Sequence, residues 1–316
     1  MKILHITAHL GGGVGTVIID WLQKDKAHSH QVVSLDYVNE KAKRSGLAFI
    51  PSGSIELAIH LADIVVCHYW DHPMLAELFS NPLPDCRMAF WCHKNFNVPA
   101  RVIQYPDRFF DTSPVQGHGA SIWSTGNMER FLAIEPKPHE GFNIGTVVSK
   151  KMDIPFVMEL FRKIKKAIPG AYFTWLGGFC AIGDSYNNDN FPGKVDDVAP
   201  HLAEMDVFAY PLRPDHYGTC EIALGEAMAA GVVPVVMNNP AERLIVRHNV
   251  DGLVSKNDND FILNIQNLSR QMHCNSYFRK RRERAKKLYS IDNMIASWNK
   301  VFAEMIQSPK TKREAL

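Results

Sequence analysis

Tyr217-Gly-Thr-Cys-Glu-Ile-Ala-Leu-Gly-Glu-Ala-Met-Ala-Ala-Gly-Val-Val-Pro-Val-Val236 is the stretch that decides the fold class of this chain. It predicts a turn of small residues, then a short helix that stops at Gly231, then a buried strand that begins at Val232. A short helix followed directly by a buried apolar strand is typical of parallel α/β sheets.

Two acids in this stretch, Glu221 and Glu226, stand among apolar and small residues. An acid beside such a junction needs a polar partner, and a bound ligand is one candidate. The helix is expected to start just after Gly218 and Thr219, with Thr219 as its N-cap and Glu221 in its first turn. Its free N–H groups would then suit a phosphate, and the acids would suit hydroxyl groups, as in a nucleotide sugar. The alternative is a solvated acid on an ordinary helix.

Size and composition exclude several classes of protein. A length of 316 residues suits two domains, and 46% apolar with 22% charged residues is typical of a globular protein. A net charge of +2 gives no case for nucleic-acid binding. We expect a cytoplasmic protein, because no apolar run is long enough to span a membrane and the N-terminus resembles a first strand more than a signal peptide. The six cysteines form no CxxC pair, which favours free thiols over a zinc site.

Short apolar runs alternate with helical patterns in the first half of the chain, which predicts a parallel sheet with helices on both faces. The expected strands are 2–7, 31–36, 63–67, 87–92, 108–112 and 121–125, and the expected helices are 14–27, 54–62 and 73–79.

A second series of the same kind follows a proline-containing linker, 134–143. We therefore predict an α/β fold of two Rossmann-like doubly wound domains facing a cleft, because ligands bind outside the carboxyl ends of such strands. The expected domains are 1–137 and 138–292, and a C-terminal helix in 293–316 would pack back toward the first domain. The second series has expected strands 142–148, 172–177, 206–211 and 232–236, and expected helices 155–168, 196–205, 242–246, 258–272 and 292–308.

A glycine loop, Gly11-Gly-Gly-Val-Gly15, follows the first strand and opens a helix. Gly13 and Gly15 would allow close approach of a phosphate or a sugar. Dinucleotide binding is the rival interpretation, since Asp36 ends the second strand about 20 residues further on, where an acid would bind ribose. The third glycine of G-x-G-x-x-G is absent, which disfavours it.

Histidines lie at or beside the predicted strand ends of the first domain: His5, His9, His68, His72 and His93. Their spacings match no zinc template, so cleft-lining or core imidazoles are the better interpretation. His93 ends the strand Met88-Ala-Phe-Trp-Cys-His93, at a carboxyl end where binding and catalytic groups collect.

Two groups of basic residues are candidate anion sites. Lys150 and Lys151 follow a strand of the second domain and precede its first helix, which would place them near a phosphate. Two solvated lysines in a turn are the alternative. Residues 278–287 carry seven basic residues, which indicates a solvated helical face or a peripheral contact with anionic membrane lipid at the inner face of the membrane.

The order of these motifs resembles that of GT-B glycosyltransferases of the retaining family 4 type (glycosyl transferases group 1). The resemblance covers nearly the whole chain. It is strongest in Phe142–Met152, Ala167–Gly178, Val195–Pro211, Leu224–Val236 and Pro240–Leu253, and the first domain adds Gly11–Gly15, Ala89–His93 and Trp123–Asn127.

The chain departs from the family pattern at two positions. The family's paired acids are E-x₇-E. Glu226 matches the second acid, but position 218 is glycine, so either Glu221 or Asp215 would replace the first. The family's diphosphate-binding arginine falls at Thr146, which leaves Lys151 or Lys150 as the matching cation.

The resemblance implies a glycosyltransferase that moves a sugar from a nucleoside diphosphate to a hydroxyl of a carbohydrate, lipid-linked or protein acceptor, in cell-envelope polysaccharide or glycolipid synthesis. It implies no metal cofactor, because cations and a helix N-terminus would neutralise the diphosphate. A nucleotide-sugar-binding subunit without catalysis is the alternative, and a sugar 2-epimerase is a weaker third. The implied catalytic residues are His93 and Glu221, and the implied donor-binding residues are Gly13, Gly15, Lys150, Lys151, Asp215, Gly218, Thr219, Cys220 and Glu226.

Overall fold

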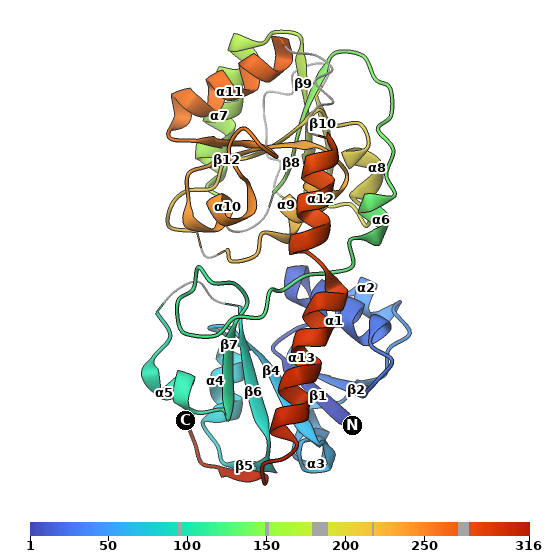
Figure 1. The fold of residues 1–316 in the computed structure, drawn as a ribbon, viewed down its shortest axis with the longest axis vertical. Helices are drawn as coiled ribbons and strands as arrows, with labels where there is room; N and C mark the ends of the chain where they lie inside the picture. Colours follow the sequence, from blue (N-terminus) through green and yellow to red (C-terminus); the bar gives the residue numbers. More distant parts are fainter. Residues whose placement is uncertain (94–96, 149–151, 179–188, 217, 271–277) are drawn as a thin grey trace. The chain divides into compact units, whose positions relative to one another are not determined.

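The chain divides into two compact units in the computed structural model (Figure 1). Unit 1 comprises Met1–Asn127 with Ser290–Leu316, and unit 2 comprises Met128–Tyr289. The boundaries therefore follow Asn127 and Tyr289, where the sequence predicted residues 137 and 292. The structure describes residues 1–93, 97–148, 152–178, 189–216, 218–270 and 278–316.

Unit 1 contains a six-stranded parallel sheet with the order β3-β2-β1-β4-β6-β7. Strand order reverses between β1 and β4, which is the topological switch point where such sheets bind ligands. The strands are β1 (Lys2–Thr7), β2 (Ser29–Ser34), β3 (Phe49–Ile50), β4 (Ile64–Tyr69), β6 (Met88–Cys92) and β7 (Arg108–Asp111). The helices between them are α1 (Gly12–Lys24), α2 (Glu40–Lys43), α3 (Ile55–Leu61), α4 (Pro73–Phe79) and α5 (Ala100–Gln104), with a 3₁₀ turn η1 (Ser52–Ser54).

The two faces of this sheet carry different side chains. Leu4 and Ile6 of β1 pack in a buried cluster with residues of α3, α4 and α5. His5 alternates with them along β1, so it points to the other face, where its ring meets Trp21 of α1 at 4.8 Å between centroids. Buried histidines therefore lie between the sheet and α1.

Helix α13 (Ile291–Met305) covers that same face of the sheet. Trp298 is fully buried, and its ring centroid lies 5.3 Å from that of Trp21 and 5.4 Å from that of Trp91. Aromatic rings at these separations pack favourably and exclude water from the histidines beside them. The last helix of the sequence is therefore part of the core of unit 1.

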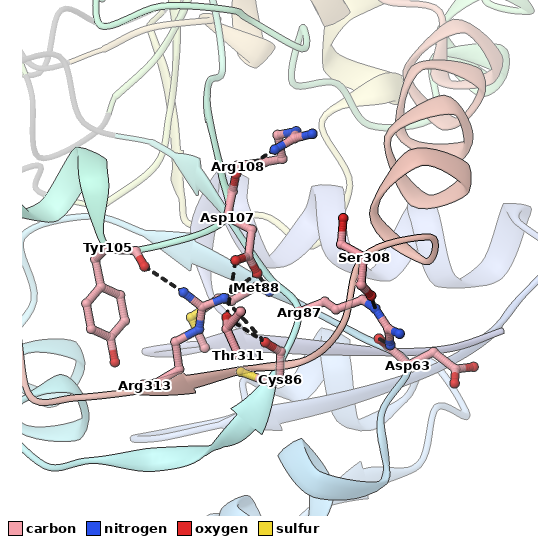
Figure 2. A network of polar contacts seen from close by, with 10 residues as sticks. All are labelled: Asp63, Cys86, Arg87, Met88, Tyr105, Asp107, Arg108, Ser308, Thr311 and Arg313. Atoms are coloured by element: carbon pink, nitrogen blue, oxygen red, sulfur yellow. Dashed lines mark hydrogen bonds and ion pairs between the residues drawn. The ribbon is translucent and has the colours of Figure 1, made fainter.

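The chain then ends in β14 (Thr311–Arg313), which pairs antiparallel with β5 (Leu83–Cys86). Figure 2 shows the guanidinium of Arg313 among backbone and carboxylate oxygens. It donates to the Tyr105 carbonyl at 2.8 Å and forms an ion pair with Asp107. A half-buried charged pair of this kind fastens the terminal strand to the edge of unit 1.

Unit 2 repeats the same sheet order as β10-β9-β8-β11-β12-β13, with every pairing parallel. Its switch point lies between β8 and β11. The strands are β8 (Phe142–Val147), β9 (Ala171–Leu176), β10 (Asn190–Gly193), β11 (Val207–Tyr210), β12 (Val233–Met237) and β13 (Leu253–Ser255). The helices are α6 (Glu129–Leu132), α7 (Ile154–Ala167), α8 (Ala199–Leu202), α9 (Ile222–Ala229), α10 (Pro240–Ile245), α11 (Asp258–Arg270) and α12 (Phe278–Leu288).

Two expected elements are wrong in extent. The predicted strand 121–125 forms a single bridge, between Ser121 and Asp111. The segment still follows the end of β7 as far as Ser124, whose N–H donates to the Thr112 carbonyl at 3.1 Å, and the Asn127 N–H then binds the Asp20 carboxylate at 2.7 Å. The predicted helix 196–205 shortens to α8. The N-cap residue is Val198, and the Asp197 carboxylate before it accepts the Ala199 N–H at 3.1 Å, so both acids lie outside the helix.

The basic residues of α12 are not all solvated. Arg281 is buried and donates to the Gly231 carbonyl at 3.0 Å, and Arg284 donates to the Leu244 and Ile245 carbonyls at 2.5 and 3.1 Å. These two arginines attach α12 to its own unit. In the described ranges, no helix is both long and apolar enough to cross a membrane. Contact of the remaining basic residues with lipid stays a prediction.

Replacing Trp298 by alanine should lower the free energy of unfolding by about 3–5 kcal/mol, because it leaves a cavity among aromatic side chains. Denaturant unfolding of the whole chain measures the loss. Lys300→Ala, at an exposed position of the same helix, is the matched control and should change stability by less than about 0.5 kcal/mol. Equal, small effects for the two variants would contradict the packing of α13.

Candidate functional site

The candidate site in unit 2 lies at the switch point of its sheet, between β8 and β11. The loops after β8 and β11 leave the carboxyl edge of the sheet there. The loop after β8 contains Lys150 and Lys151, which lie outside the described residues. The loop after β11 leads through Gly218 to α9 and brings a histidine and two glutamates together.

Glu221 stands immediately before α9, in a left-handed conformation with φ 41° and ψ 61°. The prediction that Thr219 caps the helix is wrong. The Glu221 carbonyl accepts from Leu224 N and Gly225 N at 2.9 and 3.1 Å, so the first turn begins at Glu221. A left-handed glutamate costs about 1–2 kcal/mol, which other contacts must offset.

The Glu221 carboxylate supplies such a contact. It is buried, and its Oε2 accepts a hydrogen bond from the Tyr210 hydroxyl at 2.6 Å. Burial, with the nearby Glu221 charge, raises the pKa of Tyr210 well above its usual value. Tyr210 therefore stays protonated and keeps donating to the carboxylate.

Gly218 explains where this carboxylate lies. A Cβ built on Gly218 would be 1.7 Å from Glu221 Oε1, so the carboxylate occupies the space in which a side chain at position 218 would begin. The structure thus places an acid beside the first position of the E-x₇-E pattern, from three residues further along the chain. Asp215, the other candidate, is exposed on the preceding loop.

His216 connects this carboxylate to a second one. Its Nδ1 accepts the Gly218 N–H at 3.0 Å, so its Nε2 carries the proton and donates to Glu242 Oε2 at 3.3 Å. His216 Nδ1 also lies 3.9 Å from Glu221 Oε1, and all three side chains are buried. Their ligand atoms lie within 4.8 Å of one another, a set that could hold a metal.

Sequence reasoning missed His216 and Glu242 as site residues. Glu242 stands in the stretch Pro240–Leu253, and an acid among apolar residues at the start of a helix could have indicated a buried carboxylate there. His216 had no such signal, because its partners come from two other elements.

The remaining predicted residues of unit 2 differ in exposure. Glu226 is half-buried on α9, and Thr219 is partly exposed. Cys220 is buried, and its carbonyl accepts from the Tyr289 hydroxyl at 2.6 Å, which ties the turn to the end of the unit. Thr146 is buried on β8, and its hydroxyl has no hydrogen-bond partner within the described part of the chain.

The glycine loop of unit 1 lies at the corresponding edge of the first sheet. Gly12 has φ 59° and opens α1, and Gly13 is exposed in its first turn. A Cβ on Gly15 would lie 2.7 Å from the Leu10 carbonyl carbon. Packing of α1 against the preceding loop therefore explains why residue 15 is glycine, independently of any ligand.

Four aromatic rings gather beside this loop. His9 stacks on Tyr37 with centroids 4.7 Å apart and meets Trp70 and His72 edge-on at 5.2 and 5.8 Å. Tyr37 is 47% exposed, so this cluster presents an aromatic surface to solvent. Tyr37 and Trp70 were not predicted, because the loops that carry them come together only at the sheet edge.

His93 follows β6, and its N–H donates to the Tyr69 carbonyl at 2.7 Å. Its Nε2 lies 3.2 Å from Nδ1 of His68. Burial lowers the pKa of His93 to about 3, so the ring is neutral near pH 7 and offers one donor and one acceptor nitrogen.

Comparison with solved structures shows the fold. Alr3699/HepE of Anabaena, solved with UDP, aligns over 96% of this chain and 100% of its own, with a TM-score of 0.76 and 12% identity. The chain has the GT-B fold. A glycosyltransferase of Rickettsia africae ESF-5 shares the fold with a TM-score of 0.74 and 14% identity, over 97% of this chain and 99% of its own. Sucrose-phosphate synthase of Thermosynechococcus elongatus gives a TM-score of 0.69 and 13% identity, over 97% and 100%.

Comparison by sequence agrees with the GT-B fold in the second unit. The family model described as "Glycosyl transferases group 1" matches residues 142–271. This range contains His216, Glu221, Glu226 and Glu242. No curated protein sequence matched the chain.

Gly218→Ala should lower the free energy of unfolding by about 1–3 kcal/mol, because its Cβ would collide with the Glu221 carboxylate. The same change in a Glu221→Gly background should cost much less, since the carboxylate is gone, His216 Nδ1 at 3.0 Å is the remaining close neighbour of the new Cβ, and the backbone at Gly218 does not require a positive φ. Denaturant unfolding of the four proteins gives the coupling, expected at about 0.5–3 kcal/mol. Additive effects would mean that the two residues do not share this space.

Proposed function

We propose that the protein is a glycosyltransferase that moves a sugar from a nucleoside diphosphate to a hydroxyl acceptor. The observation that carries the proposal is the match of residues 142–271 to the glycosyl transferases group 1 model. Two acids of that range, Glu221 and Glu226, lie on either side of the start of α9. Uridine diphosphate is the first donor to test, because solved structures of Alr3699/HepE contain UDP and UDP-glucose.

Each proposed donor contact has a chemical reason. Glu226 binds the ribose hydroxyls, since a half-buried carboxylate accepts two hydrogen bonds well. Lys150 or Lys151 and the backbone around Thr219 neutralise the diphosphate without a metal. Glu221 places its carboxylate beside the sugar, next to position 218.

The remaining parts of the proposal rest on the resemblance to the retaining family 4 type. Transfer retains the configuration of the sugar, His93 contacts the reacting sugar, and the acceptor is a cell-envelope polysaccharide or glycolipid. The aromatic cluster of His9, Tyr37 and Trp70 suits a carbohydrate acceptor, because flat apolar rings with polar edges pack against sugar rings.

A nucleotide-sugar-binding subunit without catalysis is the second candidate. It is favoured by the absence of an acid at position 218 and by the hydrogen bond that holds Glu221 to Tyr210. A carboxylate that stays in this bond would leave the donor sugar without its first acid.

Incubation with UDP-, GDP-, ADP- and dTDP-sugars separates these candidates, because slow donor hydrolysis needs no acceptor. Release of a nucleoside diphosphate above the level of boiled protein supports the transferase. Thermal stabilisation without release supports the binding subunit, and a ligand at 100 times its dissociation constant should add about 2.7 kcal/mol. Neither release nor stabilisation with any donor would overturn both.

Glu226→Gln should weaken binding of the active nucleoside diphosphate and of its sugar conjugate by about 10- to 150-fold alike. The reason is that a charged hydrogen bond is worth about 1.5–3 kcal/mol. Calorimetric titration measures both affinities. Glu283→Gln, an exposed acid of α12 in the same unit, is the matched control and should bind normally. A loss confined to the sugar conjugate would move Glu226 away from the ribose.

A further inference from the structure

A continuous line of histidines crosses the covered face of the unit 1 sheet. His93 Nε2 lies 3.2 Å from His68 Nδ1, and His68 Nε2 lies 3.0 Å from His5 Nδ1. His5 Nε2 lies 2.9 Å from His30 Nδ1, and His30 Nε2 lies 3.0 Å from Asp25 Oδ2. Each inner ring uses both of its nitrogens, so the line joins His93, after β6, to Asp25, after α1.

The inner rings are neutral. His5 and His68 are fully buried, and burial lowers the pKa of each well below its usual value, as do the neighbouring histidines. Burial also lowers the pKa of His30, although Asp25 acts in the opposite direction. A neutral imidazole has one N–H donor and one acceptor nitrogen. The line must therefore run in one direction throughout, with every ring in the same tautomer.

Asp25 determines that direction. Burial acts to raise the pKa of Asp25, but hydrogen bonds from Ala27 N, His30 and His28 lower it overall, so the side chain is a carboxylate. A carboxylate only accepts hydrogen bonds. His30 must then donate from Nε2, and its Nδ1 must accept from His5 Nε2. The same logic passes through His68 to His93.

We propose that Asp25, His30, His5 and His68 are positioning residues that hold His93 as the Nε2–H tautomer. His93 Nδ1 is then the nitrogen that carries the lone pair, and it acts as a hydrogen-bond acceptor for a hydroxyl of a bound sugar. The use of this lone pair rests on the proposed function, whereas the tautomer rests on the hydrogen-bond geometry and on the neutral, buried state of the inner rings.

The wild-type protein tests the tautomer directly. Nitrogen-15 NMR of histidine-labelled protein distinguishes protonated from unprotonated ring nitrogens, and the signals that His93→Gln removes identify His93. We expect protonated Nε2 and unprotonated Nδ1 at neutral pH. A protonated Nδ1 on His93 would overturn the proposal, and no substitution in the relay is needed to see it.

Asp25→Asn tests the origin of the direction. An asparagine amide can donate to His30 Nε2, so the line loses its fixed direction and a substantial fraction of His93 should become Nδ1–H. Asp63→Asn is the matched control, because Asp63 accepts from the Lys2 N–H on the same sheet and contacts none of these histidines. An unchanged His93 tautomer in folded Asp25→Asn protein would overturn the role of Asp25.

A metal ion is the competing explanation for the end of the line. Asp25, His28 and His30 place ligand atoms within 4.8 Å of one another, and a metal on His30 Nε2 would reverse every tautomer. The wild-type spectrum is therefore recorded with and without EDTA. Nδ1–H on His93 that EDTA converts to Nε2–H would replace the carboxylate by a metal and overturn the proposal.

Turnover is read separately from the tautomer. With the Nε2–H tautomer confirmed, normal donor turnover by His93→Ala, which has no side-chain acceptor, would show that the lone pair does not serve the sugar. Failure of every donor in the panel would instead overturn the proposed function and leave the tautomer result intact.

Discussion

Burial of both faces of a parallel sheet is the constraint on which this structure depends. Helices cover each sheet, so polar groups within the sheets must find partners there or lie at a carboxyl edge. The polar groups of the unit 2 site lie at the carboxyl edge, because His216 and Glu221 stand in the connection that follows β11. The histidines of unit 1 find their partners within the covered sheet, since His5 and His68 are fully buried and use both ring nitrogens.

The strained backbone at Glu221 has a similar origin. A left-handed glutamate before a helix is unfavourable in isolation, and it persists because Tyr210 binds the carboxylate and Gly218 leaves space for it. The strained backbone of Glu221 and the absence of a side chain at Gly218 are therefore parts of the same local structure. It places the Glu221 carboxylate beside position 218, the first position of the E-x₇-E pattern.

Sequence reasoning predicted the elements whose signals are local. The strand Lys2–Thr7 and the helix Pro73–Phe79 were placed correctly, because apolar periodicity and an N-terminal proline act within a few residues. It failed where distant contacts decide. Thr219 was expected to cap α9, yet Glu221 is the N-cap residue, because Tyr210 and Gly218 stabilise a conformation that propensity alone disfavours. Tyr37 and Trp70 meet only when two loops leave the same sheet edge.

The sequence by itself determined two α/β units, their strand and helix types and the glycine-rich and acidic segments, because these follow from periodicity and residue type. Only the tertiary structure decided that Glu221 fills the space beside Gly218, that α13 joins the core of unit 1 through Trp298, and that histidines from four segments form one line ending at Asp25. The physical reason is the same in each case. A hydrogen bond or a buried contact depends on distance in space, and parallel strands joined by helices bring together residues that are far apart along the chain.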